Sequence, residues 1–192
     1  MNIANKLTFF RLILAPIFFI TYLLPSKLIW TIPVFWVLFI VSGITDLLDG
    51  LAARKLNQVS DFGKLFDPFA DTLVHITYFL CFVIDGLFPA ILFLIIVYRE
   101  FGILFIRNLM LKYGTTLGAS TSGKIKTFFY IIAAGAALLI SSFERLDVFI
   151  TLLPYFKIGA KIMFAVSVIL AVISFVEYFI EYWKIRTNRK VL

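Results

Sequence analysis

Residues 158–182 read IGAKIMFAVSVILAVISFVEYFIEY, and no charged side chain lies between Lys161 and Glu177. A helix of this length crosses the roughly 30 Å hydrocarbon core of a bilayer. Five further apolar segments precede it, at about residues 7–24, 28–48, 65–84, 87–110 and 125–142. Only a helix satisfies its own backbone hydrogen bonds within one lipid-crossing segment. The sequence therefore predicts an all-α, polytopic membrane protein with six transmembrane helices.

The composition leads to the same fold class. Of the 192 residues, 62% are hydrophobic and 18% aromatic, and the mean hydropathy is +1.02. This composition is too apolar for a water-soluble domain of that length. The net charge of +7 comes from cations spread between the apolar segments. This pattern favours contact with anionic lipid head groups over nucleic acid. Without internal repeats or a soluble segment, we expect one membrane domain over residues 1–192.

Lysine and arginine are divided unequally between the two ends of the predicted helices. With the N-terminus inside, 14 of the 18 lie on the inner side and 4 on the outer side. The positive-inside rule therefore places both termini in the cytoplasm. We expect an integral, multi-pass protein of a bacterial inner membrane.

Four aspartates form two pairs at the predicted inner ends of the second and third segments. Asp46 and Asp49 are spaced i, i+3, and Asp67 and Asp71 are spaced i, i+4, so each pair shares a helical face. Two facing pairs repel each other unless a cation lies between them. Oxygen ligands without His or Cys select a hard ion such as Mg²⁺ or Mn²⁺. The pattern predicts two such ions and a bound diphosphate; solvated acids at helix ends are the alternative.

A longer pattern surrounds these aspartates. Residues 46–54 read DLLDGLAAR, and after eight further residues, residues 63–71 read GKLFDPFAD. This stretch resembles the signature of the CDP-alcohol phosphatidyltransferases, which is D-x-x-D-G-x-x-A-R, eight residues, G-x-x-x-D-x-x-x-D. The resemblance implies a six-helix membrane enzyme, usually a homodimer, with a polar cavity that opens to the cytoplasm. Such an enzyme displaces CMP from a CDP-activated lipid.

The resemblance also implies roles for single residues. The metal ligands would be Asp46, Asp49, Asp67 and Asp71, and Asp71 would also be the general base for the acceptor hydroxyl. The residues around the CDP group would be Asp46, Gly50, Ala53, Arg54 and Gly63. The chemistry agrees, because small residues leave room for a nucleotide, Gly63 permits a close backbone approach, and Arg54 can donate two hydrogen bonds to a phosphate.

Three other segments resemble one branch of that family, the phosphatidylglycerophosphate synthases, which use glycerol 3-phosphate. They are NIANKLTFFR at 2–11 followed by Pro16, the Arg99-Glu100 pair followed by Arg107, and SGKIKT at 122–127. Two positions depart from the pattern of this branch. Ala4 replaces the usual Pro, and Thr72 replaces a common Lys, which removes one cation beside the predicted base.

An anionic acceptor agrees with the cations on the predicted inner side. The candidate ligands for its phosphate are Arg99, Arg107, Lys124 and Lys126. Further candidates for the pocket are Asn5, Thr8 and Arg11. For both sets, ordinary anchoring to lipid head groups is the alternative. His75 is interpreted as a structural residue, and Asp61 as a solvated loop residue.

The expected reaction transfers the phosphatidyl group of CDP-diacylglycerol to glycerol 3-phosphate, giving phosphatidylglycerophosphate and CMP. An alternative keeps this chemistry but uses inositol phosphate, serine or a phospholipid as acceptor. A small cation-coupled transporter is the alternative from another class, because intramembrane carboxylates also bind translocated cations. The acids gather toward one side of the membrane, however, which favours a catalytic pocket with one mouth.

Overall fold

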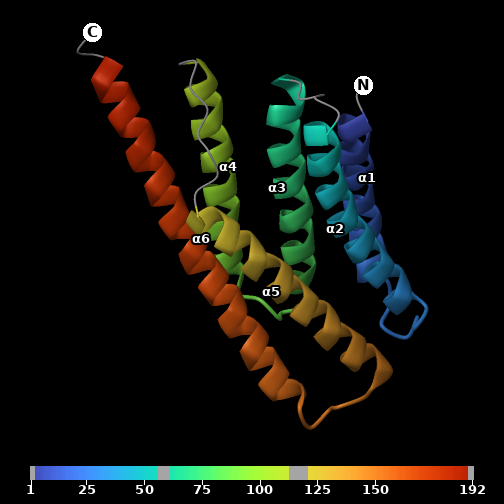
Figure 1. Cartoon of the computed structure of the whole chain (residues 1–192). Helices are drawn as coiled ribbons and strands as arrows, with labels where there is room; N and C mark the ends of the chain where they lie inside the picture. Colours follow the sequence, from blue (N-terminus) through green and yellow to red (C-terminus); the bar gives the residue numbers. More distant parts are fainter. Residues whose placement is uncertain (1–2, 56–60, 113–120, 190–192) are drawn as a thin grey trace.

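The structure, a computed structural model, describes residues 3–55, 61–112 and 121–189, and this part of the chain forms six α-helices and no strand (Figure 1). The helices are α1 (Ile3–Leu23), α2 (Thr31–Lys55), α3 (Asp61–Ile84), α4 (Ala90–Lys112), α5 (Thr121–Leu146) and α6 (Leu153–Arg189). The predicted all-α fold is therefore confirmed.

Four of these helices are long and apolar enough to cross a membrane. The stretches are Asn5–Leu23, Leu65–Ile84, Ser122–Leu146 and Leu153–Thr187. In α2 the apolar stretch is shorter and covers Thr31–Asp46, while α4 carries Arg99 and Glu100 near its middle and Arg107 closer to its end. The chain is an integral membrane protein, and six spans remain a prediction.

The six helices fall on the six predicted segments, with two notable differences at their ends. Gly86 has φ of +69°, a conformation that glycine adopts without steric cost, and it ends the turn after α3. Helix α6 has 37 residues, about 55 Å at 1.5 Å per residue, and is longer than the predicted 158–182. Asp61 was expected in the loop but is the first residue of α3. An acidic residue is favourable at the start of a helix.

The six helices form two groups that meet along α3 and α4 (Figure 1). In the amino-terminal half, α1 packs against α2 and α3; in the carboxy-terminal half, α6 packs against α4 and α5. Aromatic rings fill the core between the halves. The ring of Phe79 in α3 packs edge-on against Tyr130 in α5 and Phe164 in α6, each with centroids 5.0 Å apart. Phe164 also stacks on Phe88 at 4.1 Å.

A polar cluster joins the helices at the end of the bundle away from the termini. Both termini lie at the same end, at the top of Figure 1. At the opposite end, Arg145 in α5 donates to the Thr31 hydroxyl over 2.8 Å and to the backbone carbonyl of Tyr22. The Tyr22 hydroxyl in turn donates to Asp85 in the turn after α3. These contacts join α1, α2, α3 and α5 at the end away from the termini.

Candidate functional site

All six helices line one cavity of about 330 Å³. The amino-terminal half contributes Arg11, Asp46, Asp71 and His75 to its wall. The carboxy-terminal half contributes Arg99, Glu100, Arg107, Lys124, Lys126 and Tyr178. Acids of the aspartate pattern and the predicted acceptor-binding cations therefore share one space, although up to 80 residues separate them in the sequence.

Arg11 connects two of the aspartates. Its guanidinium is buried, with Nη1 in contact with the Asp46 carboxylate of α2 and Nη2 at 2.8 Å from the Asp71 carboxylate of α3. Both carboxylates keep an accessible face, since their side chains are 49% and 40% exposed. A cation thus lies between carboxylates of two helices, as their charges require.

The rest of the amino-terminal segment is also buried against this region. Thr8 is fully buried and donates from its hydroxyl to Oδ1 of Asp67 over 2.7 Å, and Asn5 is buried one turn earlier. One face of α1 therefore contacts three of the four aspartates, through Thr8 and Arg11. Of this segment, the cavity wall includes only Arg11 among the described residues.

Part of the predicted site lies outside the described side chains. Asp49, Gly50, Ala53 and Arg54 follow Asp46 in α2, and their side chains are not among the described ones. Gly63 lies in the first turn of α3 and is buried. The described residues contain no group of three or more Asp, Glu, His or Cys side chains arranged to hold a metal. The carboxylate oxygens of Asp46 in α2 and Asp71 in α3, which lie on either side of Arg11, nevertheless fit the chemistry of a hard divalent ion.

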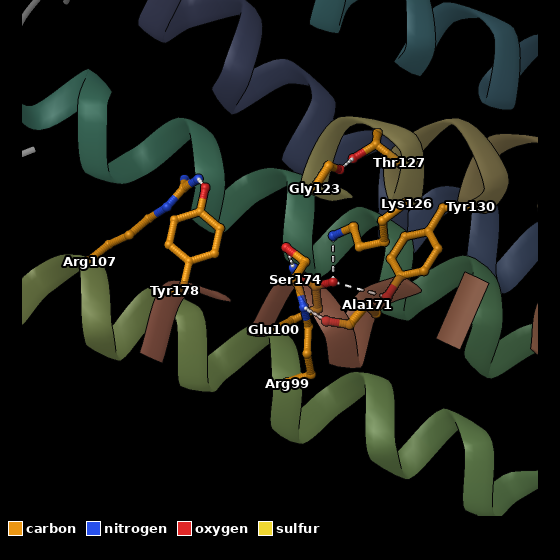
Figure 2. A network of polar contacts seen from close by, with 10 residues as sticks. All are labelled: Arg99, Glu100, Arg107, Gly123, Lys126, Thr127, Tyr130, Ala171, Ser174 and Tyr178. Atoms are coloured by element: carbon orange, nitrogen blue, oxygen red, sulfur yellow. Dashed lines mark hydrogen bonds and ion pairs between the residues drawn. The ribbon is translucent and has the colours of Figure 1, made fainter. Parts of the chain in front are cut away.

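Arg107 and Lys124 form the more open part of the cationic wall. The Arg107 guanidinium donates from Nη2 to the Tyr178 hydroxyl over 3.1 Å and lies 5.5 Å from the Tyr178 ring centroid (Figure 2). Its Nε is buried and has no hydrogen-bond partner in the described part of the chain. Lys124 is exposed at the start of α5. Both side chains line the cavity, where their charged groups can meet a ligand.

Arg99 and Lys126 are instead held by protein groups (Figure 2). Arg99 donates from Nε to the carbonyl of Ala171, from Nη2 to Ser174 and from Nη1 to Glu100, each over 2.9 Å. Lys126 donates to Glu100 over 2.7 Å, and its Nζ lies 4.5 Å from the centroid of the Tyr130 ring. All three charged side chains are buried.

Glu100, Tyr130 and Tyr178 were not predicted to have roles of their own, although all three contact the cations of this wall. A signal for Glu100 was present, because a carboxylate in an apolar helix is costly unless a cation pairs with it. His75 lines the cavity, and its ring packs edge-on at 5.5 Å from the Tyr130 ring. This contact agrees with the structural interpretation of His75.

Comparison with known proteins points to one family. The family model described as CDP-alcohol phosphatidyltransferase matches residues 1–173. A Treponema pallidum protein named CDP-diacylglycerol–glycerol-3-phosphate 3-phosphatidyltransferase is 39% identical over 142 residues, which are 73% of this chain and 66% of that protein. A Bacillus subtilis protein of the same name is 36% identical, over 95% of this chain and 96% of its own length. A probable phosphatidylglycerophosphate synthase of Mycobacterium tuberculosis is 29% identical, over 92% and 79%.

Proposed function

Because the chain belongs to the CDP-alcohol phosphatidyltransferase family, we propose that it transfers the phosphatidyl group of CDP-diacylglycerol to glycerol 3-phosphate and releases CMP. One observation carries this proposal: a single cavity has carboxylates on its amino-terminal half and cations on its carboxy-terminal half. Relatives named for this reaction support the choice of acceptor. Family membership also favours an enzyme over a cation-coupled transporter.

The carboxylates are proposed to hold the metal. Enzymes of this family generally use divalent metal ions, and we assign two ions, Mg²⁺ or Mn²⁺, to Asp46, Asp49, Asp67 and Asp71. When bound, such ions neutralise the diphosphate and stabilise the charge on the departing CMP. Arg11 orients Asp46 and Asp71 by holding one oxygen of each. We assign Gly50, Ala53, Arg54 and Gly63, together with Asp46, to the CDP group.

Asp71 is proposed as the general base. Its side chain reaches the cavity from α3 and is partly exposed, so an acceptor hydroxyl can approach it. The carboxylate takes the hydroxyl proton while the oxygen attacks the phosphorus that carries the diacylglycerol. The new bond joins the acceptor oxygen to this phosphorus, and the bond from phosphorus to the bridging oxygen of the diphosphate breaks, releasing CMP.

Arg107 and Lys124 are proposed to bind the phosphate of the acceptor. Tyr178 fixes the Arg107 guanidinium through a hydrogen bond and a stacking contact, so the donors of Arg107 keep a defined direction. Because the Arg107 side chain lines the cavity and is only partly buried, its guanidinium can donate to a phosphate oxygen as well as to Tyr178. Arg99 and Lys126 add positive charge to the same wall, although their donors are occupied by protein groups.

The orientation in the membrane is part of the proposal. We place both termini and the mouth of the cavity in the cytoplasm, in a bacterial inner membrane, because the inner side then carries 14 of the 18 cations. Both termini at one end of the bundle agree with an even number of membrane passages. Membrane lipids surround the exposed apolar surface, and a homodimer is the expected assembly.

An acceptor screen tests the reaction. Purified protein in detergent is supplied with CDP-diacylglycerol and with glycerol 3-phosphate, inositol phosphate or serine, and CMP release is measured. We expect CMP only with glycerol 3-phosphate. If inositol phosphate alone supports release, the acceptor is wrong; if no acceptor does, the reaction is wrong.

Two variants test the acceptor site. Arg107→Gln and Lys124→Gln should each raise the KM for glycerol 3-phosphate by about tenfold or more, because each removes one charged donor to a phosphate. The KM for CDP-diacylglycerol should change by less than about threefold. Lys161→Gln removes an exposed cation outside the cavity wall and serves as the control. An unchanged acceptor KM in both variants would place the acceptor phosphate elsewhere.

A further inference from the structure

The buried group of Arg99, Glu100, Lys126 and Tyr130 is a closed set of contacts (Figure 2). Glu100 uses both carboxylate oxygens within it: Oε2 accepts from Arg99, and Oε1 accepts from Lys126 and from the Tyr130 hydroxyl at 3.0 Å. Each guanidinium nitrogen of Arg99 also has a protein acceptor. The donors of this group, which come from α4 and α5, thus have acceptors on α4 and α6.

Arg107 differs from this group although it lies in the same wall. It is seven residues after Glu100 in α4, and so about 10 Å away along the helix axis. Its partner is the neutral Tyr178 hydroxyl, and no carboxylate pairs with it among the described residues. A ligand anion therefore gains most from Arg107 and Lys124, whose charge is not already compensated.

We propose that Glu100 is a positioning residue, which holds Arg99 and Lys126 in the wall so that Arg107 and Lys124 alone bind the acceptor phosphate. Glu100 also limits the positive charge of the cavity, because Arg99, Glu100 and Lys126 together carry one net charge and not two. This inference rests on the proposed function, in which the cavity binds a phosphate-bearing acceptor.

The limit on charge matters for turnover. The acceptor and the product share the same phosphate group, so a stronger cationic wall binds both more tightly. Replacing Glu100 with the isosteric Gln adds one net positive charge about 10 Å along α4 from Arg107. At an intermediate dielectric constant, this charge should strengthen phosphate binding by about 3- to 20-fold. The acceptor KM should fall, and kcat should fall with it because product leaves more slowly.

Binding of inorganic phosphate provides the test without turnover. Its affinity is measured by calorimetry on the full-length protein in detergent, for wild type, Glu100→Gln, Arg107→Gln and the double variant Glu100→Gln/Lys126→Gln. We expect tighter binding for Glu100→Gln and at least tenfold weaker binding for Arg107→Gln. The double variant restores the net charge, so its affinity should lie within about threefold of wild type. Glu181→Gln, an exposed acid of α6 outside the cavity wall, is the charge control and should change nothing.

Three outcomes would overturn the inference. If the double variant binds phosphate as weakly as Arg107→Gln, Lys126 is a direct ligand. If Glu100→Gln leaves phosphate affinity unchanged, Glu100 does not limit the charge, and if wild type binds no phosphate at millimolar concentration, the wall is not a phosphate site. If Glu100→Gln does not fold, the double variant is compared with wild type instead. Phosphate binding as weak as that of Arg107→Gln would again overturn the inference. Absence of turnover with glycerol 3-phosphate would refute the proposed function and leave the phosphate affinities as the test of Glu100.

Discussion

Replacing Asp71 with Asn should separate catalysis from stability. The Asp71 side chain is 40% exposed and lies 2.8 Å from Nη2 of Arg11. A partly exposed ion pair contributes only about 0–1 kcal/mol, the Asn oxygen still accepts from Arg11, and Arg11 keeps its contact with Asp46. We therefore expect the free energy of unfolding to fall by at most about 1 kcal/mol.

Catalysis should respond far more strongly. Loss of a general base lowers the rate by about 10²–10⁴, which is about 2.7–5.4 kcal/mol of activation free energy. Weaker metal binding adds to this loss. The difference between the two effects is large enough to be resolved in one set of preparations.

The assay is CMP release at saturating substrates and metal, beside a denaturant titration of the same preparation. Asp147→Asn is the matched control, since Asp147 is exposed after α5 with φ of 58°, a conformation that Asn also tolerates. Turnover of Asp71→Asn within tenfold of wild type would refute its role as base. A fall in unfolding free energy above about 3 kcal/mol would refute the argument from partial exposure.

Two further predictions concern the metal and the packing of α4 on α6. A chelator should abolish turnover and Mg²⁺ or Mn²⁺ should restore it, because four carboxylates need a cation beside a diphosphate; full turnover in metal-free buffer would contradict this. In Gly102→Ala the new Cβ would lie 2.7 Å from Cε2 of Phe175, so the ring must shift and the free energy of unfolding should fall by about 1 kcal/mol. Gly135→Ala is the control, with nothing within 4 Å of its added Cβ, and equal unfolding midpoints for the two variants would show that this contact is not tight.

The sequence predicted the helices well because lipid imposes a simple requirement. Apolar length identified all six helices in the described residues, and the gap between the predicted segments 65–84 and 87–110 contains the turn at Gly86. The carboxy-terminal end of α6 was predicted too early, because the largely polar residues after Tyr182 continue the helix to Arg189. Hydropathy marks the part of a helix that lies in lipid and is silent about a polar extension.

The candidate site was predicted in part, for a related physical reason. Helical spacing shows which aspartates share a face, so the pairing of Asp67 with Asp71 was accessible from the sequence. The position of Arg11 between Asp46 and Asp71 depends on how α1 packs on α2 and α3. Spacing within one helix carries no information about that packing. Arg11 was accordingly a candidate for the pocket without a defined partner.

The cations show the same limit. Their place near the predicted inner side indicated that Arg107 and Lys126 would gather, and both line the cavity. Their different environments follow from neighbours on other helices, Tyr178 for Arg107 and Tyr130 for Lys126. A residue count treats these side chains as equal charges, whereas burial and hydrogen bonding make one available to a ligand and engage the other.

The division of the bundle into two groups of helices affects how a damaged copy of this protein should be recognised. Asp71 belongs to one group and Arg107 to the other, and aromatic contacts such as that of Phe79 with Phe164 hold the groups in register. A variant can therefore keep all its helices, aspartates and cations and still be inactive, if a change in the aromatic packing between the two groups moves one of them by about 1 Å. An intact aspartate motif shows that a chain belongs to the family, but activity also depends on the packing between the two groups of helices.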